Sequence, residues 1–152
     1  MASLSPLSNL PLLQIDSVAK TYGEHHVQAL SAVTINIARG EFVSLMGASG
    51  CGKSTLLNLI AGLDSASSGR IIFDGADVTK LTDEAVTALR AKKIGFVFQF
   101  FNLLSTLTVE ENVALPLELG GATNASERQK RVLEMLTEVG MESRLKFYPS
   151  QL

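Results

Sequence analysis

The feature that most constrains this chain is a glycine-rich loop at residues 47–54, which reads Gly-Ala-Ser-Gly-Cys-Gly-Lys-Ser. The loop fits G-x-x-x-x-G-K-[ST] at every fixed position, follows the apolar run Phe42–Met46, and precedes a helical pattern that starts near Lys53. Glycines let the backbone curve into a nest of inward-pointing N–H groups, and the following helix adds its positive dipole end. These residues predict a cradle for a polyphosphate.

Two side chains of the loop add chemistry that a simple turn does not need. Lys53 can place its charge on the β- and γ-phosphates of a nucleotide, and the Ser54 hydroxyl can ligate Mg²⁺. A glycine turn explains neither residue, and a dinucleotide-type loop has a different glycine spacing and no role for the lysine. The sequence therefore predicts a Mg²⁺–nucleotide site made of Gly47, Ala48, Ser49, Gly50, Cys51, Gly52, Lys53, Ser54 and Thr55.

Composition argues against several other classes of protein. Thirteen Lys and Arg against fifteen Asp and Glu leave a formal net charge of −2, which does not suit nucleic-acid binding by bulk electrostatics. A single cysteine, Cys51, excludes an internal disulfide framework. The longest uncharged run, Ile94–Val109, is interrupted by polar residues and is shorter than the roughly 20 residues of a membrane span. With no basic n-region near the N-terminus, we expect a cytoplasmic protein.

The pattern along the chain predicts an α/β fold with a partly parallel sheet. Residues 1–11 resemble a loose leader. Two continuous apolar runs, Phe42–Met46 and Ile94–Phe98, are typical of buried interior strands. A separate antiparallel layer is expected at the N-terminal end from three shorter patterns, at Leu12–Val18, Val27–Leu30 and Val33–Ala38. Another strand is expected at Gly69–Asp74, where the Asp74-Gly75 turn closes it.

Four helices are expected from their start and stop signals. Pro116 should kink or shorten the third, and apolar residues recur at helical spacing in the fourth. The four expected helices are Lys53–Ala61 before Gly62, a helix from Thr82 or Asp83 to about Lys93, one starting at the Thr108-x-x-Glu111 capping box, and one starting at a Ser126-x-x-Gln129 box and stopping at Gly140.

The loop by itself does not choose among nucleotide enzymes. A GTPase would carry Asn-Lys-x-Asp for guanine and a D-x-x-G switch, and neither pattern occurs. A small-molecule kinase would need a lid rich in arginine, and the stretch Ala76–Lys93 offers only Arg90. The choice must come from the residues around the loop.

Those residues resemble the nucleotide-binding subunit of an ABC transporter, from about Leu12 to Leu152. The stretch FNLLSTLTVEENVALPLELGG is closest to the lipoprotein-release and macrolide-export (LolD/MacB-like) branch. Besides the loop, the segments that carry the resemblance are Lys20-Thr-Tyr22-Gly, Gly62-Leu-Asp64, Ser68-Gly69, Asp74-Gly75 and Ile94-Gly-Phe-Val-Phe-Gln99.

The resemblance implies a P-loop NTPase core of ABC type that binds ATP and Mg²⁺. Tyr22 aligns with an aromatic residue that stacks on adenine, a role that a ring of its size suits, although an ordinary strand tyrosine is the alternative. Gln99 aligns with a glutamine whose amide reaches Mg²⁺ and the attacking water. Phe100–Thr108 aligns with the region that lines a groove for a helix of the membrane permease, and plain core packing is the alternative for its apolar residues. A homodimer at the cytoplasmic face of the inner membrane is implied as well.

The resemblance also implies an incomplete domain, because Leu152 aligns with the first residue of the family's L-S-G-G-Q signature. The signature, the Walker B carboxylates, the switch histidine and the C-terminal part of the sheet would then lie beyond Leu152. Within residues 12–152, the β layer and phosphate loop are expected over about 12–98 and the glutamine loop and helical segment over about 99–152. We expect Mg-ATP binding, negligible hydrolysis by this chain alone and a compromised dimer. A non-catalytic nucleotide-binding or permease-docking module, or a non-functional remnant, is the alternative.

Overall fold

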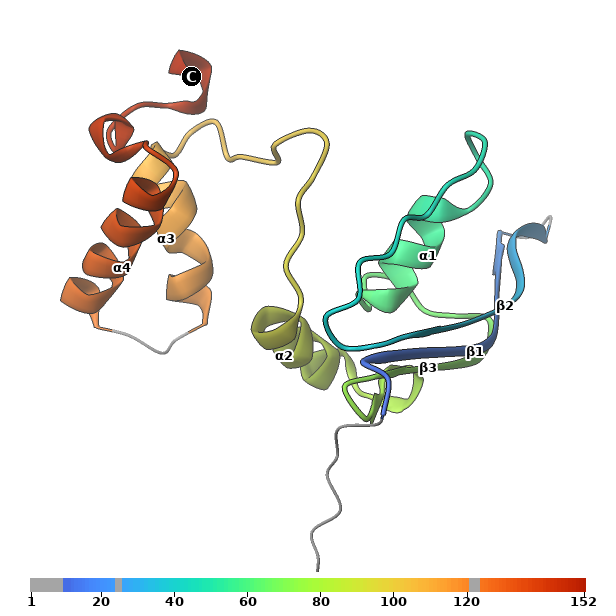
Figure 1. Ribbon diagram of the computed structural model, residues 1–152. Coiled ribbons are helices and arrows are strands. Elements are labelled where there is room, and N and C mark those ends of the chain that lie inside the picture. Colours follow the sequence, from blue (N-terminus) through green and yellow to red (C-terminus); the bar gives the residue numbers. More distant parts are fainter. Residues whose placement is uncertain (1–9, 24–25, 121–123) are drawn as a thin grey trace, which may run out of the picture. The chain divides into compact units, whose positions relative to one another are not determined.

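The computed structural model describes residues 10–23, 26–120 and 124–152 (Figure 1). The chain divides into two compact units, the first being Met1–Gly95 and the second Phe96–Leu152. Most of the expected leader, residues 1–9, lies outside the described residues. Each unit has its own cluster of buried apolar side chains.

The first unit is built on an antiparallel sheet with the strand order β2-β1-β3-β4. The central strand β1 pairs with β2 on one side and with β3 on the other, and β3 pairs with β4. The antiparallel layer expected from the alternating segments is therefore confirmed. The bounds of the strands are Leu13–Tyr22 for β1, Val27–Ile37 for β2, Ser68–Phe73 for β3 and Ala76–Asp77 for β4.

Strand β2 covers two segments that the sequence pattern separates. The pairing register shifts between Val18↔Val33 and Lys20↔Leu30, and Ala32 has a positive φ of 47°. A bulge of this kind interrupts the alternation of side chains without ending the strand. Because β2 continues, β1 keeps a partner as far as Tyr22, which pairs with Val27.

Helix α1 (Lys53–Ile60) lies over one face of this sheet (Figure 1). It buries Leu56 and Leu59 in a cluster with Ile15, Val18 and Ile71 of the strands. Gly62, with φ of 63°, ends the helix in the left-handed conformation that the sequence predicts. The expected Asp74-Gly75 turn joins β3 to β4, and both of its residues have positive φ, as a two-residue hairpin of type I′ requires.

A short 3₁₀ turn, η2 (Val78–Lys80), and helix α2 (Asp83–Lys93) complete the first unit. Thr82 caps α2 by accepting a hydrogen bond from the Ala85 N–H. Thr82 was one of the two cap residues predicted.

The second unit is a pair of helices, α3 (Val109–Leu119) and α4 (Ala125–Glu138), followed by the short turns η3 (Glu142–Arg144) and η4 (Pro149–Gln151). Val109, Val132 and Leu136 form its buried cluster. Thr108 and Glu111 make both halves of the predicted capping box at the start of α3. Helix α3 continues beyond Pro116 to Leu119.

The predicted start of α4 was wrong, although its predicted stop was right. The side chain of Asn124, not that of Ser126, accepts the cap hydrogen bond, from the Glu127 N–H at 2.9 Å. Asparagine and serine are both good N-caps, and here the helix begins two residues earlier than the Ser-x-x-Gln box suggests. Gly140, with φ of 68°, follows the end of α4.

The two predicted interior strands, Phe42–Met46 and Ile94–Phe98, were also wrong, because neither run is a strand. Phe42 is 94% exposed and Val97 is fully exposed. A strand is held by the hydrogen bonds of a neighbouring strand, and within the described residues neither run pairs with one. Apolar composition alone therefore does not make these runs strands.

Candidate functional site

The glycine-rich loop joins the end of the Phe42–Met46 run to the first turn of α1, and it is solvent-exposed along most of its length. Gly50 and Gly52 have positive φ values of 78° and 94°, so the chain turns twice within three residues. Because Gly52 is the N-cap of α1, the helix starts with no side-chain cap. The N–H groups of its first turn have no acceptor within the helix and are open to an anion.

Gly52 also fits where no other residue would. A Cβ atom added at this position would lie 2.5 Å from the carbonyl oxygen of Ala29 and 2.8 Å from a methyl group of Leu30, both on β2. The end of the loop therefore rests directly on the sheet. This contact holds the start of α1 at a defined place on the first unit.

The ammonium group of Lys53, at the end of the loop, is hydrogen-bonded to the first residues of the loop. Its Nζ donates hydrogen bonds to the carbonyl oxygens of Gly47 at 2.8 Å and Ala48 at 2.7 Å, and it lies 3.5 Å from Cys51 Sγ. The positive charge is thus held beside the backbone that the sequence predicts to bind phosphate. The predicted site residues of the loop are contiguous in the chain, with Ser49 and Ser54 exposed and Thr55 half-buried.

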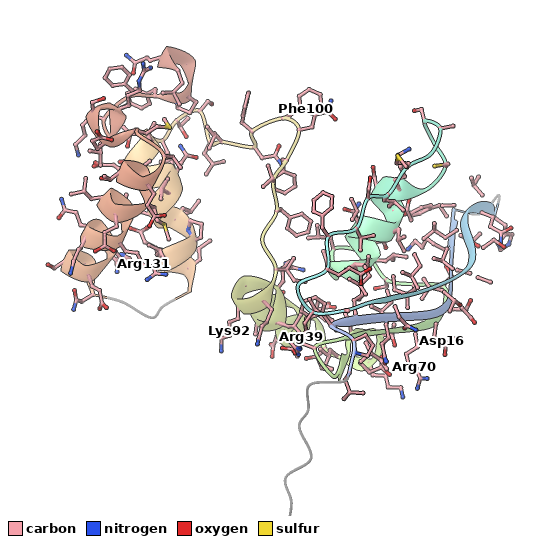
Figure 2. All side chains as sticks on the ribbon, viewed as in Figure 1. Asp16, Arg39, Arg70, Lys92, Phe100 and Arg131 are labelled. Carbon is pink, nitrogen blue, oxygen red and sulfur yellow. The ribbon has the colours of Figure 1, made fainter. Side chains whose placement is uncertain are left out.

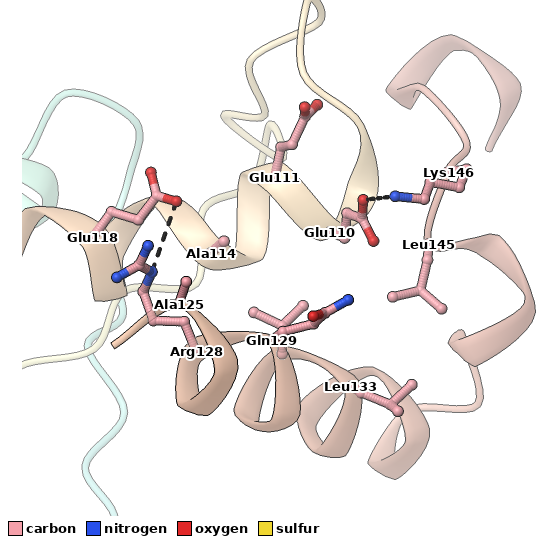
Figure 3. Close-up of a pocket in the computed structure, with 11 residues that line it drawn as sticks. Glu110, Glu111, Ala114, Glu118, Ala125, Arg128, Gln129, Leu133, Leu145 and Lys146 are labelled. Carbon is pink, nitrogen blue, oxygen red and sulfur yellow. Dashed lines mark hydrogen bonds and ion pairs between the residues drawn. The ribbon is translucent and has the colours of Figure 1, made fainter. Parts of the chain in front are cut away.

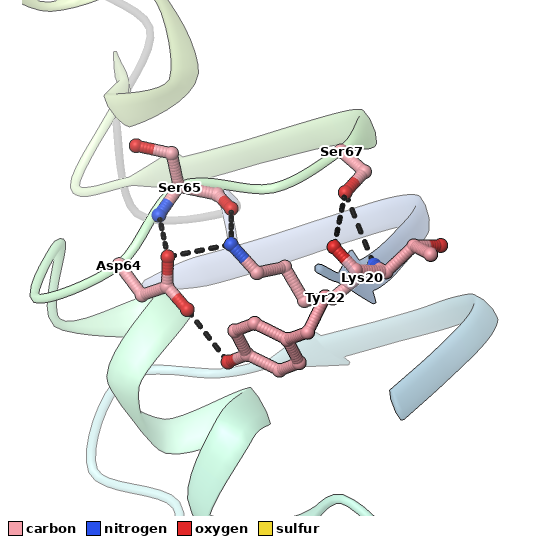
Figure 4. Close-up of polar contacts among 6 residues, drawn as sticks. Lys20, Tyr22, Asp64, Ser65 and Ser67 are labelled. Carbon is pink, nitrogen blue, oxygen red and sulfur yellow. Dashed lines mark hydrogen bonds and ion pairs between the residues drawn. The ribbon is translucent and has the colours of Figure 1, made fainter. Parts of the chain in front are cut away.

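Tyr22, the predicted base-stacking residue, lies at the end of β1 in a set of polar contacts (Figure 4). Its hydroxyl donates a hydrogen bond to Asp64 Oδ2 at 2.6 Å. Lys20 Nζ donates to Asp64 Oδ1 at 2.6 Å and to the carbonyl oxygen of Ser65 at 2.7 Å. The same ammonium lies over the Tyr22 ring, 4.7 Å from its centroid, and the tyrosine is 40% exposed.

These contacts keep Asp64 ionised. The hydrogen bond from Lys20 is the largest influence that lowers the pKa of the Asp64 carboxyl below its ordinary value of 3.8, and the bond from Tyr22 is the next. A carboxylate that accepts donated hydrogen bonds is stabilised in its charged form. The tyrosine hydroxyl therefore donates to an anion at neutral pH.

Lys20 and Asp64 received no role from the sequence. Lys20 stands two residues before Tyr22, so both side chains leave the same face of β1, and that spacing was a usable signal. Asp64 is separated from Tyr22 by 42 residues, and nothing local joins them. Only the fold brings the carboxylate to the ring.

Gln99 and the segment Phe100–Thr108 belong to the second unit. Gln99 lies on a stretch without helix or strand, and its predicted contact with Mg²⁺ stays a prediction. Figure 2 shows the Phe100 ring projecting from this stretch. Phe100, Phe101 and Leu103 line an apolar groove of about 930 Å³ together with residues of α3, of α4 and of the C-terminal segment.

A second groove of about 520 Å³ lies between α3 and α4 (Figure 3). Its rim carries charges in pairs: Lys146 bonds to Glu110, and Arg128 lies 3.8 Å from Glu118. Hydrogen bonds from the Thr108 backbone and hydroxyl lower the pKa of Glu111 below its ordinary value. This groove contains no residue that the sequence analysis singled out for chemistry.

Among residues 10–23, 26–120 and 124–152, no three His, Cys, Asp or Glu side chains gather as a metal site would require. Within the same ranges, no helix has the length and apolar character needed to cross a bilayer.

Comparison with known proteins gives consistent matches. A family model described as ABC transporter matches residues 30–152. The chain is 42% identical over 148 residues to the macrolide export ATP-binding/permease protein MacB of Brucella abortus (strain 2308), covering 96% of this chain and 23% of MacB. It is 40% identical over 147 residues to the methionine import ATP-binding protein MetN of the same organism, covering 97% of this chain and 39% of MetN.

A solved structure of the ATP-binding cassette MJ0796, a dimer in a post-hydrolysis state bound to ADP and Pi, matches with a TM-score of 0.83 and 46% identity. The match covers 92% of this chain and 62% of the MJ0796 chain. The chain thus has the cassette fold, and it spans only 23% of the length of MacB and 39% of the length of MetN.

Proposed function

Because this chain belongs to the ABC transporter family, as part of its ATP-binding domain, we propose that residues 47–55 bind the triphosphate of Mg-ATP. The observation that carries the proposal is the position of Lys53 Nζ, within 2.8 Å of two carbonyl oxygens of a loop that opens a helix without a side-chain cap. A phosphate oxygen entering the loop would meet this ammonium and the first-turn N–H groups together. No other group of the described loop supplies a positive charge.

The residues present fit a magnesium nucleotide. Mg²⁺ takes oxygen ligands and keeps several waters, so it needs few protein groups. We assign the Ser54 hydroxyl and the Gln99 amide oxygen as those groups, and the Tyr22 ring as the platform for the base. When bound, Mg²⁺ would neutralise charge on the β- and γ-phosphates. The backbone nest and Lys53 do the remaining work of binding and orienting.

Hydrolysis needs a group that accepts a proton from the attacking water. The proposed site residues include no carboxylate, since Gly47–Thr55, Tyr22 and Gln99 contain no Asp or Glu. A positioned base is worth about 10²–10⁴-fold in rate. We therefore propose that the polypeptide of residues 1–152 by itself binds Mg-ATP and turns it over at a negligible rate.

The partner we propose is a membrane permease that docks on the Phe100–Thr108 side of the second unit, at the cytoplasmic face of the membrane. The apolar groove lined by Phe100, Phe101 and Leu103 supports this assignment, as does the name of MacB as an ATP-binding/permease protein. MJ0796 was solved as a dimer, which supports pairing with a second cassette. Overall identity does not distinguish export from import, because it is 42% to MacB and 40% to MetN. We propose export because residues 101–121 resemble the lipoprotein-release and macrolide-export branch.

Isothermal titration with Mg-ATP tests the proposed site. We expect Lys53→Ala to weaken binding by about 10- to 100-fold, the loss that corresponds to a charged hydrogen bond of about 1.5–3 kcal/mol. Lys80→Ala is the matched control, because Lys80 is an exposed lysine of the same unit on η2. Equal affinity of the Lys53 variant and the parent, in samples with the same circular dichroism, would overturn the proposal.

A steady-state ATPase assay tests the second part. Turnover that Lys53→Ala abolishes would show that residues 1–152 hydrolyse ATP alone. Binding without turnover, together with recovery of a membrane partner, would favour a non-catalytic docking module.

A further inference from the structure

Tyr22 is held more firmly than base stacking alone requires. An exposed tyrosine hydroxyl can bond to water, yet here it donates to a carboxylate that Lys20 already holds at 2.6 Å. The Lys20–Asp64 pair has side-chain exposures of only 12% and 27%. Its geometry is therefore better defined than that of a typical solvated pair.

From this arrangement we infer that Lys20 and Asp64 are positioning residues, which orient the Tyr22 ring for the base of the nucleotide. The inference rests on the proposed function and adds to it two residues that touch the ring but not the phosphates. Asp64 holds the edge of the ring through the hydroxyl, and Lys20 lies over one of its faces (Figure 4).

The position of Lys20 also selects which face of the ring is used. Its ammonium lies 4.7 Å from the ring centroid and covers one face. A base can then stack only on the opposite face. A ring limited in this way loses less rotational freedom when the base binds, which lowers the cost of binding.

Asp64 connects the ring to the phosphate loop through α1. The loop leads into α1 at Lys53, and Asp64 follows the end of the same helix by four residues. Eight helical residues span about 12 Å. Base platform and phosphate cradle are thus tied to opposite ends of one helix.

The segment that carries Asp64 is itself fixed to β1. The Ser67 N–H donates to the carbonyl oxygen of Ala19 at 2.9 Å, and Ser67 Oγ accepts from the Thr21 N–H at 3.1 Å. At the helix end, the Leu63 N–H donates to Asn58 O at 2.9 Å. Asp64 therefore lies on a short connection anchored at both ends.

Two ligands separate positioning of the base from binding of the phosphates. Mg-ATP uses both sites, whereas magnesium tripolyphosphate has no base and needs only the loop. We expect Tyr22→Phe and Asp64→Ala each to weaken Mg-ATP binding by about two- to tenfold, the range set by the cost of ordering one side chain. Binding of tripolyphosphate should not change. Asp64→Ala should add little in the Tyr22→Phe background, because both variants remove the same hydrogen bond.

Asp16→Ala is the matched control, since it removes an ion pair with Arg70 elsewhere on β1 and β3 (Figure 2). It should leave both affinities unchanged. The inference is overturned if Tyr22→Phe binds Mg-ATP as the parent does, or if the Asp64 variant loses tripolyphosphate as well. If the parent protein binds tripolyphosphate and the two variants bind Mg-ATP as tightly as the parent does, only the positioning role is rejected. The proposed phosphate site is then unaffected. A folded parent protein that binds neither ligand would overturn the proposed function and the inference together.

Discussion

Position 52 must be glycine for two independent reasons, one conformational and one steric. Its φ of 94° is in the region that costs other residues about 1–2 kcal/mol. An added Cβ would also lie 2.5 Å from the Ala29 carbonyl oxygen, a backbone atom that cannot move without disturbing β2. Gly50 shares the first constraint, with φ of 78°, but its added Cβ would meet nothing within 4 Å.

We therefore predict that Gly52→Ala lowers the free energy of unfolding of the first unit by more than about 2 kcal/mol, and Gly50→Ala by about 1–2 kcal/mol. Urea unfolding of the two variants beside the parent protein measures the difference. Equal losses would mean that the loop does not rest on β2 as described.

At the same scale, the residues of the proposed phosphate loop could be singled out from the sequence because their motif depends on spacing within eight positions. Lys53 and Ser54 need only the glycines beside them to be recognised. The support of Tyr22 was not predictable in the same way. Asp64 reaches the tyrosine across 42 residues, and its identity as a partner depends on how α1 packs on the sheet.

Among the elements, helices were predicted better than strands because their ends depend on local hydrogen bonds. Thr108 and Glu111 stabilise the start of α3 from within four residues, and Gly62 and Gly140 follow helix ends as expected. A strand depends on a neighbour that can lie anywhere in the sequence. Phe42–Met46 has the composition of a strand and pairs with nothing among the described residues, so composition predicted it wrongly.

The start of α4 offers a test between two nearby capping residues. Asn124→Ala removes the bond that the Glu127 N–H donates, and we expect it to destabilise the second unit by about 0.5–2 kcal/mol. Ser126→Ala, two residues further on, should change stability by less than about 0.5 kcal/mol, because Ser126 is an exposed residue inside the helix. The measurement is thermal or urea unfolding, monitored by the circular dichroism signal of the helices. A larger effect at Ser126 than at Asn124 would show that Ser126 is the N-cap, as the Ser-x-x-Gln box predicts.

For the whole molecule, the division into two units determines which parts of the chain a bound nucleotide can stabilise. The phosphate loop and Tyr22 belong to the first unit, whereas Gln99 and the apolar groove belong to the second. Each unit has its own buried cluster, so neither needs the other's apolar residues to form a core. A ligand that contacts residues of both units would couple them, and a ligand that contacts only the loop would stabilise the first unit alone.

Hydrogen exchange distinguishes these cases and tests the assignment of Gln99. Mg-ATP should slow exchange in α1 and at the end of β1 whether or not Gln99 ligates the metal. If Gln99 does so, protection should extend to the stretch around residue 99, and Gln99→Ala should remove that part only. The same variant should weaken Mg-ATP binding by about tenfold, equivalent to about 1.4 kcal/mol.

The control for the metal is ATP with EDTA, for which Gln99→Ala and the parent protein should bind equally, because the amide then has no ion to reach. The control for the substitution is Gln129→Ala, an exposed glutamine of α4 in the same unit. An unchanged Mg-ATP affinity in the Gln99 variant, with no protection near residue 99 in the parent, would confine the nucleotide to the first unit. The proposed phosphate binding by Lys53 and the loop would then be assigned to residues of the first unit alone.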